Sequence, residues 1–465
     1  KSFQVAFSRN SQEITGTPHN KNIVALGVLL EITGISEEQA IGAITGDHEV
    51  DLLKNNLAAL EAGKKLFFEL SIPSLRLSRP QDYSKKVIIQ GNTAMAQAAI
   101  RADCKAFFGY PITPAAEIMK EMENLLQETG GIFLQAEDEI ASAGLVIGAS
   151  LAGAKSVTCT SGPGLDLMTE MMGLAVAAEI PMVIIDVQRC GPSTGIPSKS
   201  EQSDLYHAVY GGHGDTPRVV LAPYNVEGCY RLVIEGIGIA QYYQTVVVLL
   251  SDQSLGQTLV AVNDEFLTRE YAAQERKRPS GDDIQEYHRY RLTDDFISPM
   301  AVAGDEESPY QTSGLTHNET GAPSFDFETH QRMHQKRWHK LMPLRQRGDL
   351  VKLFGNEEAD RGIITWGSSA QVVLETVEEL GLQNTVKVCV PELICPLPQQ
   401  VESFLKSTQK LLVVEMNYSG QLYHYLRSQI DLPGSTDVYA RAGGRPFSKK
   451  ELAGPIARVG ENVSR

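Results

Sequence analysis

Four short segments of the sequence combine charged, hydroxyl and glycine residues, and each directly follows a short apolar run. They cover residues 110–114, 137–139, 160–164 and 189–195. Side chains of these types can hold an anion, share a proton or leave room for a flat ring. The four segments are therefore the candidates for a functional site.

The first segment reads Tyr110, Pro111, Ile112, Thr113 and Pro114. Two prolines three positions apart fix the backbone at both ends of a turn, and Pro114 suits the first turn of a following helix. Thr113 is then predicted to be the N-cap residue, with its hydroxyl near the free helix amides. The same pattern is compatible with a plain strand–turn–helix connection, so spacing alone leaves a binding role open.

The second segment is acidic and ends at Glu139. Acids in a first helical turn are favoured by the helix dipole, which is the simpler interpretation. Glu139 is, however, followed by small residues at positions 141–144, which would let a ring or another backbone lie close to the helix. A carboxylate in such a poorly solvated place can hydrogen-bond or protonate a heteroaromatic nitrogen.

The third segment is the glycine-rich turn of residues 160–164, which contains Gly162. Its amides could cradle an anion at the start of a helix predicted over residues 165–178. The turn matches neither the Walker pattern nor the dinucleotide fingerprint G-x-G-x-x-G, and glycine-rich strand–helix turns are common.

The fourth segment begins with Arg189, a fixed cation suited to a carboxylate. Ser193 and Thr194 add hydroxyl groups, and Lys199 adds a second cation. An exposed loop with a single salt bridge is the alternative. Four groups compatible with an anion, all between residues 189 and 199, favour a binding site.

No metal site is predicted on this chain. His330 and His334 would share a helix face, but no third ligand is evident. The six cysteines are scattered and form no C-x-x-C pair, which excludes the usual zinc and iron–sulfur spacings. Unclustered cysteines without a signal peptide predict a reducing, cytoplasmic location.

Apolar runs alternate with helical patterns over residues 87–255, and the strands and helices that they predict would position the four segments. This alternation predicts an α/β domain with a mostly parallel sheet, and ligands bind beyond the carboxyl ends of such strands. The predicted strands cover residues 87–90, 105–108, 131–135, 155–160, 182–187 and 245–251.

The remainder of the chain divides into three parts. Residues 1–80 are predicted to be mainly helical and to end in a polar linker, and residues missing before Lys1 are expected. Residues 257–355 lack clear periodicity until 327–341 and are predicted to be a connector with an interface role. Residues 360–465 return to alternation and predict a second, smaller α/β domain.

Composition limits the classes of function. The chain has 465 residues and a formal charge of −15, without a basic stripe, which argues against nucleic-acid binding. No apolar run reaches the roughly 18 residues of a membrane span, so no membrane partner is expected.

Taken together, these motifs resemble the alpha subunits of 2-oxoacid:ferredoxin oxidoreductases, in the fused gamma–alpha form of the 2-oxoglutarate (2-oxoglutarate synthase) branch. The resemblance is carried by QGNTA at 90–94, YPITP at 110–114, Glu139, RCGPSTG at 189–195 and SEQSDL at 200–205. It implies that residues 1–80 end a gamma domain, that 87–255 form the pyrimidine-binding domain of a thiamine diphosphate enzyme, and that 360–465 form a transketolase C-terminal-like domain.

The resemblance also implies roles for single residues. Glu139 matches the glutamate that hydrogen-bonds the aminopyrimidine of thiamine diphosphate and supports removal of the C2 proton. The cofactor would further contact Tyr110, Pro111, Ile112 and Gly162, and the substrate would contact Thr113, Arg189, Thr194 and Lys199. Because a dicarboxylate needs two anion sites, Arg189 and Lys199 together favour 2-oxoglutarate as the substrate.

The implied reaction is oxidative decarboxylation of 2-oxoglutarate to succinyl-CoA with electrons passed to ferredoxin, or the reverse carboxylation. The sequence lacks the GDG…NN signature and clustered cysteines. Magnesium, the diphosphate site and a 4Fe–4S cluster are therefore expected in a partner beta subunit, within an (alpha–beta)2 assembly. Alternatives are the same chemistry on a branched-chain or aryl 2-oxoacid, a transketolase-like enzyme without redox function, or a non-catalytic scaffold subunit.

Overall fold

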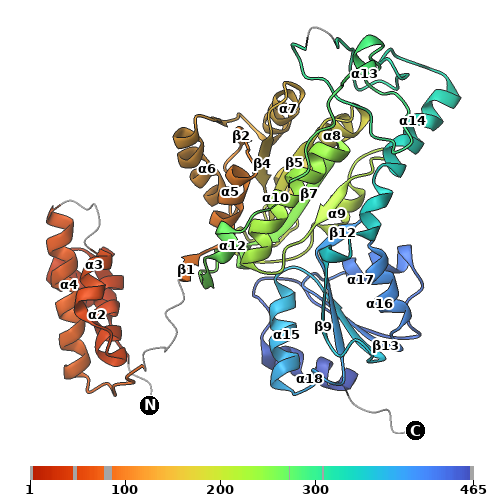
Figure 1. Ribbon diagram of the computed structural model, residues 1–465. Helices are drawn as coiled ribbons and strands as arrows, with labels where there is room; N and C mark the ends of the chain where they lie inside the picture. The colour runs from red at the N-terminus through yellow and green to blue at the C-terminus, as the bar shows by residue number, and fades with distance from the viewer. Residues whose placement is uncertain (1–3, 45–49, 78–85, 272, 306–307, 461–465) are drawn as a thin grey trace, which may run out of the picture. The chain divides into compact units, whose positions relative to one another are not determined.

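The computed structural model describes residues 4–44, 50–77, 86–271, 273–305 and 308–460. Within it the chain forms two compact units, Lys1–Lys85 and Lys86–Arg465 (Figure 1). The division falls at the end of the polar linker predicted from the sequence.

The described part of the first unit is built from helices. Helices α2 (Lys21–Thr33) and α4 (Val50–Glu69) cross closely, and the crossing depends on two glycines. A Cβ on Gly27 would collide with the Leu60 carbonyl, and a Cβ on Gly63 would collide with the Val24 carbonyl. The elements are α1 (Phe7–Thr15), the short 3-10 helix η1 (Pro18–Asn20), α2 (Lys21–Thr33), α3 (Glu37–Ile44) and α4 (Val50–Glu69).

The second unit contains a seven-stranded sheet that is parallel except at one edge. In spatial order its strands are β12 (Leu393–Cys395), β6 (Val219–Leu221), β7 (Val246–Asp252), β5 (Met182–Gln188), β4 (Ser156–Thr160), β2 (Ala106–Gly109) and β3 (Ile132–Gln135). Only β12 runs antiparallel to its neighbour. The α/β class with a mostly parallel sheet, predicted from the sequence, is confirmed.

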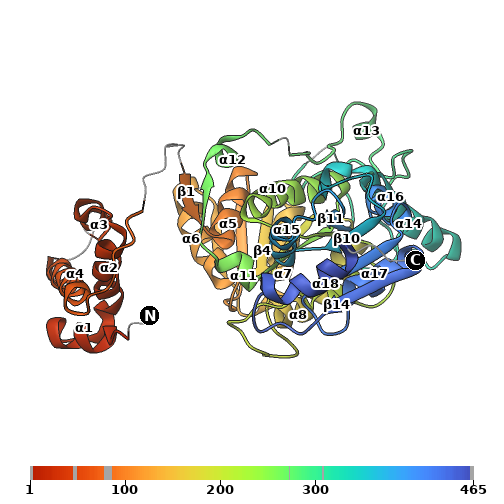
Figure 2. The ribbon, with the colours of Figure 1, turned by 90° about the horizontal axis from the view of Figure 1, so that it is seen from below.

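Helices cover both faces of this sheet (Figures 1 and 2). On β5, Val183 and Ile185 pack with the first set of helices, whereas Met182 and Ile184 pack with the second. Burial on both faces explains why the strands are continuous apolar runs. The first set is α5 (Gly91–Arg101), α6 (Ala116–Thr129) and α10 (Val226–Tyr243); the second is α7 (Glu139–Leu151), α8 (Gly162–Ala177) and α9 (Leu205–Tyr210).

One predicted strand does not join the seven-stranded sheet. The segment predicted as a strand over 87–90 corresponds to β1 (Lys86–Ile89), which pairs antiparallel with β8 (Val260–Asn263) in a separate two-stranded ribbon. Only Ile89 of β1 is buried, so this strand lacks the two covered faces of the others. The three-residue strands β6 and β12 are too short to be predicted from periodicity.

The C-terminal part of the second unit carries a five-stranded sheet. Its strands, in spatial order, are β14 (Ser435–Ala440), β13 (Lys410–Glu415), β10 (Arg361–Thr365), β11 (Lys387–Pro391) and β9 (Val351–Gly355), with β9 antiparallel to β11. Its helices are α15 (Ser369–Glu379), α16 (Gln399–Lys406), α17 (Gln421–Gln429) and α18 (Lys449–Gly460). Trp366 and Leu422 belong to the same apolar cluster as Ile184, so the two sheets share a continuous core.

The connector packs on the seven-stranded domain of its own chain. Tyr290 donates its hydroxyl to the Ala178 carbonyl, and Arg276 binds the Ser150 carbonyl and the Gln241 amide oxygen. An interface with another chain stays a prediction. The connector elements are α11 (Gln253–Gln257), α12 (Glu265–Thr268), α13 (Asp282–Gln285), α14 (Phe327–His339), and the 3-10 helices η2 (Met342–Gln346) and η3 (Gly348–Leu350).

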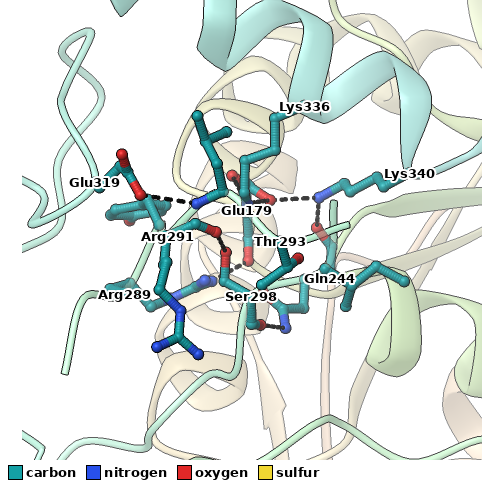
Figure 3. Close-up of polar contacts among 12 residues, drawn as sticks. Glu179, Gln244, Arg289, Arg291, Thr293, Ser298, Glu319, Lys336 and Lys340 are labelled. Atoms are coloured by element: carbon teal, nitrogen blue, oxygen red, sulfur yellow. Dashed lines mark hydrogen bonds and ion pairs between the residues drawn. The ribbon is translucent and has the colours of Figure 1, made fainter. Parts of the chain in front are cut away.

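A buried ion cluster fixes α14 of the connector to the end of α8 (Figure 3). Lys336 donates to both Glu179 oxygens at 2.6 and 2.7 Å, and Lys340 donates to Oε2 at 2.8 Å. Burial alone would raise the pKa of Glu179, but the two ammonium groups hold that pKa well below its usual value. Arg289 adds a hydrogen bond to the Glu179 carbonyl at 2.6 Å.

We expect Glu179→Gln to lower the free energy of unfolding by about 3–5 kcal/mol, because it leaves two buried ammonium groups without a counter-charge. Denaturation followed by tryptophan fluorescence measures this loss, since Trp338 lies in α14. The double variant Glu179→Gln with Lys336→Met should recover part of the stability. An unchanged midpoint in the single variant would show that the cluster does not contribute.

None of the helices in the described ranges combines the length and apolarity needed to cross a bilayer.

Candidate active site

All four segments singled out in the sequence lie at one edge of the seven-stranded sheet. They follow β2, β3, β4 and β5, which are neighbours in the order β5-β4-β2-β3 and run parallel. The carboxyl ends of parallel strands meet at the same edge, so the segments approach one another although up to about 80 residues separate them.

Arg189 joins the first and fourth segments. Its guanidinium Nη1 donates to the Thr113 carbonyl oxygen at 2.6 Å, and only 7% of the residue is exposed. Its Nε atom is buried and has no hydrogen-bond partner among the described residues. A buried cation with an unused donor is suited to bind an anion.

The predicted capping role of Thr113 is wrong. The helix after this segment, α6, begins at Ala116, and its N-cap is Ala115. Residues 113–115 form a turn before the helix starts, and no side chain caps α6. The backbone carbonyl of Thr113 accepts the hydrogen bond that orients Arg189.

Glu139 is the first residue of α7, and Asp138 caps the helix by accepting a hydrogen bond from the Ala141 amide at 2.7 Å. Glu139 is 5% exposed. A Cβ on Gly164 would lie 2.5 Å from Glu139 Oε1, so the glycine makes room for the carboxyl group at the start of α8. Burial raises the pKa of Glu139 above its ordinary value.

A cavity of about 500 Å³ opens beside Arg189 and is lined by both α/β domains. The seven-stranded domain contributes Gly162, Asp166, Arg189, Ser193, Glu201, Asp204 and His207 among others, and the C-terminal domain contributes Asn417, Tyr418, Ser419, Gln421 and Ala442. The cavity therefore exists only when the two domains are packed together.

The segment SEQSDL, residues 200–205, joins the two domains through hydrogen bonds. Gln202 donates to the Trp366 carbonyl at 2.8 Å and accepts from the Met416 amide at 2.9 Å. Glu201 accepts from the amides of Gly191 and Gly443, at 3.1 and 2.8 Å. This segment thus holds in place both the loop that carries Arg189 and the opposite wall of the cavity.

The other predicted site residues lie at the surface. Tyr110 and Pro111 are exposed and Ile112 is half-buried, in the turn that carries Thr113. Thr194 and Lys199 are exposed, and neither lines the cavity of Arg189. Their predicted contacts with cofactor and substrate remain predictions.

Sequence reasoning missed Glu201, Asp204 and His207, which line the cavity. The signal available for Glu201 and Asp204 was SEQSDL at 200–205, which supports the resemblance but was given no chemical role, and His207 lies two positions beyond it. His207 Nδ1 lies 3.0 Å from Asp166 Oδ1, and its Nε2 lies 3.1 Å from the Thr169 hydroxyl.

The absence of a metal site on this chain stays a prediction. Across the described ranges, no group of three or more His, Cys, Asp or Glu side chains has a metal-binding arrangement. His330 Nδ1 lies 3.0 Å from the Thr316 hydroxyl.

Known proteins match this chain over most of its length. The family described as "Pyruvate flavodoxin/ferredoxin oxidoreductase, thiamine diP-bdg" matches residues 97–336. A 2-oxoglutarate synthase subunit KorA from Methanothermobacter marburgensis is 34% identical over 381 residues, which are 80% of this chain and 99% of the relative. The alpha subunit of 2-oxoacid:ferredoxin oxidoreductase 1 from Sulfurisphaera tokodaii is 31% identical and covers 95% of this chain and 72% of its own length.

A solved structure is also similar throughout. The 2-oxoglutarate:ferredoxin oxidoreductase from Magnetococcus marinus, solved with 2-oxoglutarate, coenzyme A and succinyl-CoA bound, has a TM-score of 0.89 and 38% identity. The match covers 99% of this chain and 80% of that chain.

The parallel sheet with its site at the strand ends, together with the matched family, defines a subunit of a thiamine-diphosphate-dependent oxidoreductase. This chain belongs to the alpha subunits of the 2-oxoacid:ferredoxin oxidoreductases. The family predicted from the motifs is thereby confirmed, and so is thiamine diphosphate as its cofactor. As an alpha subunit, the chain works with partner subunits.

Proposed function

We propose that this chain is the alpha subunit of a 2-oxoglutarate:ferredoxin oxidoreductase, which forms succinyl-CoA and reduces ferredoxin, or runs the reverse carboxylation. The hydrogen bond between Arg189 and the Thr113 carbonyl carries the proposal, because it fixes a buried cation in the wall of the cavity. The names of the KorA relative and of the Magnetococcus enzyme support 2-oxoglutarate as the substrate.

Arg189 holds one carboxylate of the substrate. Its Nη1 is fixed by Thr113, whereas its Nε is unpartnered among the described residues, so the guanidinium keeps a donor for a ligand. A charge-assisted hydrogen bond in a buried place orients a carboxylate more strongly than a surface lysine would. The distal carboxylate is left for Lys199, for Thr194 or for the partner subunit.

The residues around Glu139 fit the aminopyrimidine of thiamine diphosphate. Among the described residues, no side chain donates a hydrogen bond to this buried carboxyl group, and its raised pKa suits a shared proton. When bound, thiamine diphosphate supplies the carbon nucleophile and the electron sink for decarboxylation. Glu139 would share a proton with the ring nitrogen, and Tyr110, Pro111, Ile112 and Gly162 would help to hold the cofactor.

An apolar surface beside Glu139 supports a partner beta subunit at this edge. The edge strand β3 exposes Ile132 by 61% and Leu134 by 44%, and α7 exposes Ile140 and Leu145. An uncovered apolar edge strand is a ready interaction site. We propose that the beta subunit covers it and supplies magnesium, the diphosphate site and the 4Fe–4S cluster, within a cytoplasmic (alpha–beta)2 assembly.

The function is tested by assaying the chain assembled with its beta subunit. With 2-oxoglutarate, coenzyme A and ferredoxin, the complex should form succinyl-CoA and reduced ferredoxin, and faster than it uses pyruvate or 2-oxoisovalerate. Preference for 2-oxoisovalerate or an aryl 2-oxoacid would move the enzyme to another branch. Absence of turnover in an assembled, cofactor-loaded complex would favour a scaffold role.

The isolated chain should bind thiamine diphosphate weakly. Most of the affinity for this cofactor is expected from diphosphate and magnesium contacts that the sequence lacks. Calorimetry of the chain with and without its beta subunit, in the presence of magnesium, measures the difference. Tight, magnesium-dependent binding to the isolated chain would contradict the proposed division of the site.

A further inference from the structure

A second cavity, of about 320 Å³, opens where the seven-stranded domain, the connector and the C-terminal domain meet. We call it the junction cavity, and its volume lies within the range of small-molecule sites. It shares no lining residue with the cavity of Arg189. Helix α9 lies between the two cavities, since His207 lines the first and Val209 and Tyr210 line the second.

Arg218 in the wall of the junction cavity is a buried cation without a counter-charge. The residue is 2% exposed, and its Nε and Nη2 atoms donate to the Thr216 and Gly211 carbonyls and to the Thr216 hydroxyl. These acceptors are uncharged, and Arg218 forms no ion pair with any residue in the described ranges. Nη1 carries two N–H groups but has a single acceptor, the Met172 sulfur at 3.5 Å.

Burial lowers the pKa of Arg218 to about 10, so the guanidinium still carries its charge at pH 7. A buried cation without a counter-charge is costly, and an anion bound beside it would offset that cost. A guanidinium also binds a carboxylate with charge-assisted hydrogen bonds.

The other ionisable side chains of the junction cavity do not neutralise Arg218. Arg345 is itself paired with Glu402. Asp215 is exposed, and the structure gives no ion pair between it and Arg218. Burial raises the pKa of Cys395 to about 11, so its thiol is neutral at pH 7.

The remaining walls are mainly aromatic and apolar. Trp338 and Tyr210 keep large exposed areas, and the Tyr210 ring lies 6.2 Å from the ring of the buried Tyr425. Flat side chains of this kind bury an aromatic ligand well. Aliphatic and proline side chains complete the lining: Leu341, Met342, Pro396 and Leu397.

We propose that the junction cavity binds a small organic anion with a flat apolar body, and that Arg218 holds the carboxylate of this ligand. The apolar walls take up the body of the ligand, while the free N–H of Nη1 and the charge of the guanidinium select its anionic end. The ligand is neither substrate of the reaction, because the junction cavity and the cavity of Arg189 have no residue in common.

The test is calorimetry of the assembled alpha–beta complex with two probes, indole-3-acetate and its uncharged analogue indole-3-acetamide. Both carry the same flat ring, so they differ in the charge that Arg218 would recognise. Indole-3-acetate should bind about 10- to 100-fold more tightly, the usual effect of a hydrogen bond to a charged group. Saturating 2-oxoglutarate or coenzyme A should displace neither probe.

Arg218→Met should reduce the affinity for indole-3-acetate to that for the amide. Arg427→Met is the matched control, because it removes an exposed cation of α17 that does not line the cavity and should keep the preference. If Arg218→Met fails to assemble, two variants that leave Arg218 in place replace it. Trp338→Ala should weaken both probes several-fold, and Asp215→Asn should strengthen indole-3-acetate alone by about two- to fivefold.

Equal affinity for the two probes, or a preference that persists in Arg218→Met, would overturn the proposed site. Unchanged binding in both Trp338→Ala and Asp215→Asn would do the same. Displacement by 2-oxoglutarate or coenzyme A would assign the probe to a substrate site and would also overturn it. None of these results bears on the turnover of 2-oxoglutarate, which is assayed without the probes.

Discussion

Replacing Glu139 with glutamine should slow C2 proton exchange of bound thiamine diphosphate by a factor of roughly 10²–10⁴, the usual contribution of one positioned acid–base group. Glutamine keeps the shape of the side chain beside Gly164 but cannot hold a transferable proton. Because burial raises the pKa of Glu139, the folded chain should tolerate the neutral amide without loss of stability. Hydrogen–deuterium exchange at C2 in the assembled complex measures the rate directly.

Glu137→Gln provides the matched control, since it removes an exposed acid two positions earlier in the same turn. It should exchange at the rate of the unmodified enzyme. If the Glu139→Gln complex with bound cofactor exchanged at the wild-type rate, the role of Glu139 would be limited to a favourable interaction with the helix dipole at the start of α7.

Replacing Arg189 with methionine should raise KM for 2-oxoglutarate by roughly 30- to 1,000-fold, which corresponds to about 2–4 kcal/mol for a buried charge pair that loses one partner. Methionine fills a similar volume, and the Thr113 carbonyl loses its donor. Steady-state kinetics of the assembled enzyme with 2-oxoglutarate and with pyruvate measure the loss for each acid.

The comparison of the two acids identifies the end of the substrate that Arg189 holds. A much smaller loss with pyruvate would place Arg189 at the distal carboxylate. Equal losses would place it at the reacting end and move the distal role to Lys199 or the partner subunit, which Lys199→Met then tests. Unchanged kinetics with both acids would remove Arg189 from the site.

Patterns local in the chain are enough to predict the class of fold and the edge of the sheet where the site lies. The buried parallel strands are short apolar runs because helices cover both of their faces, and such runs can be recognised without knowledge of their neighbours. The loops after parallel strands must converge, so the order of motifs along the chain already assigns Thr113, Glu139 and Arg189 to one edge.

Which atoms meet at that edge depends on contacts between distant parts of the chain. The Arg189–Thr113 contact uses a backbone carbonyl, which no side-chain motif can reveal. The cavity needs Gln202 to reach Trp366 across 164 positions of sequence. Such contacts arise from how whole domains pack, and packing is set by the summed shape of many side chains rather than by the residues of any one motif.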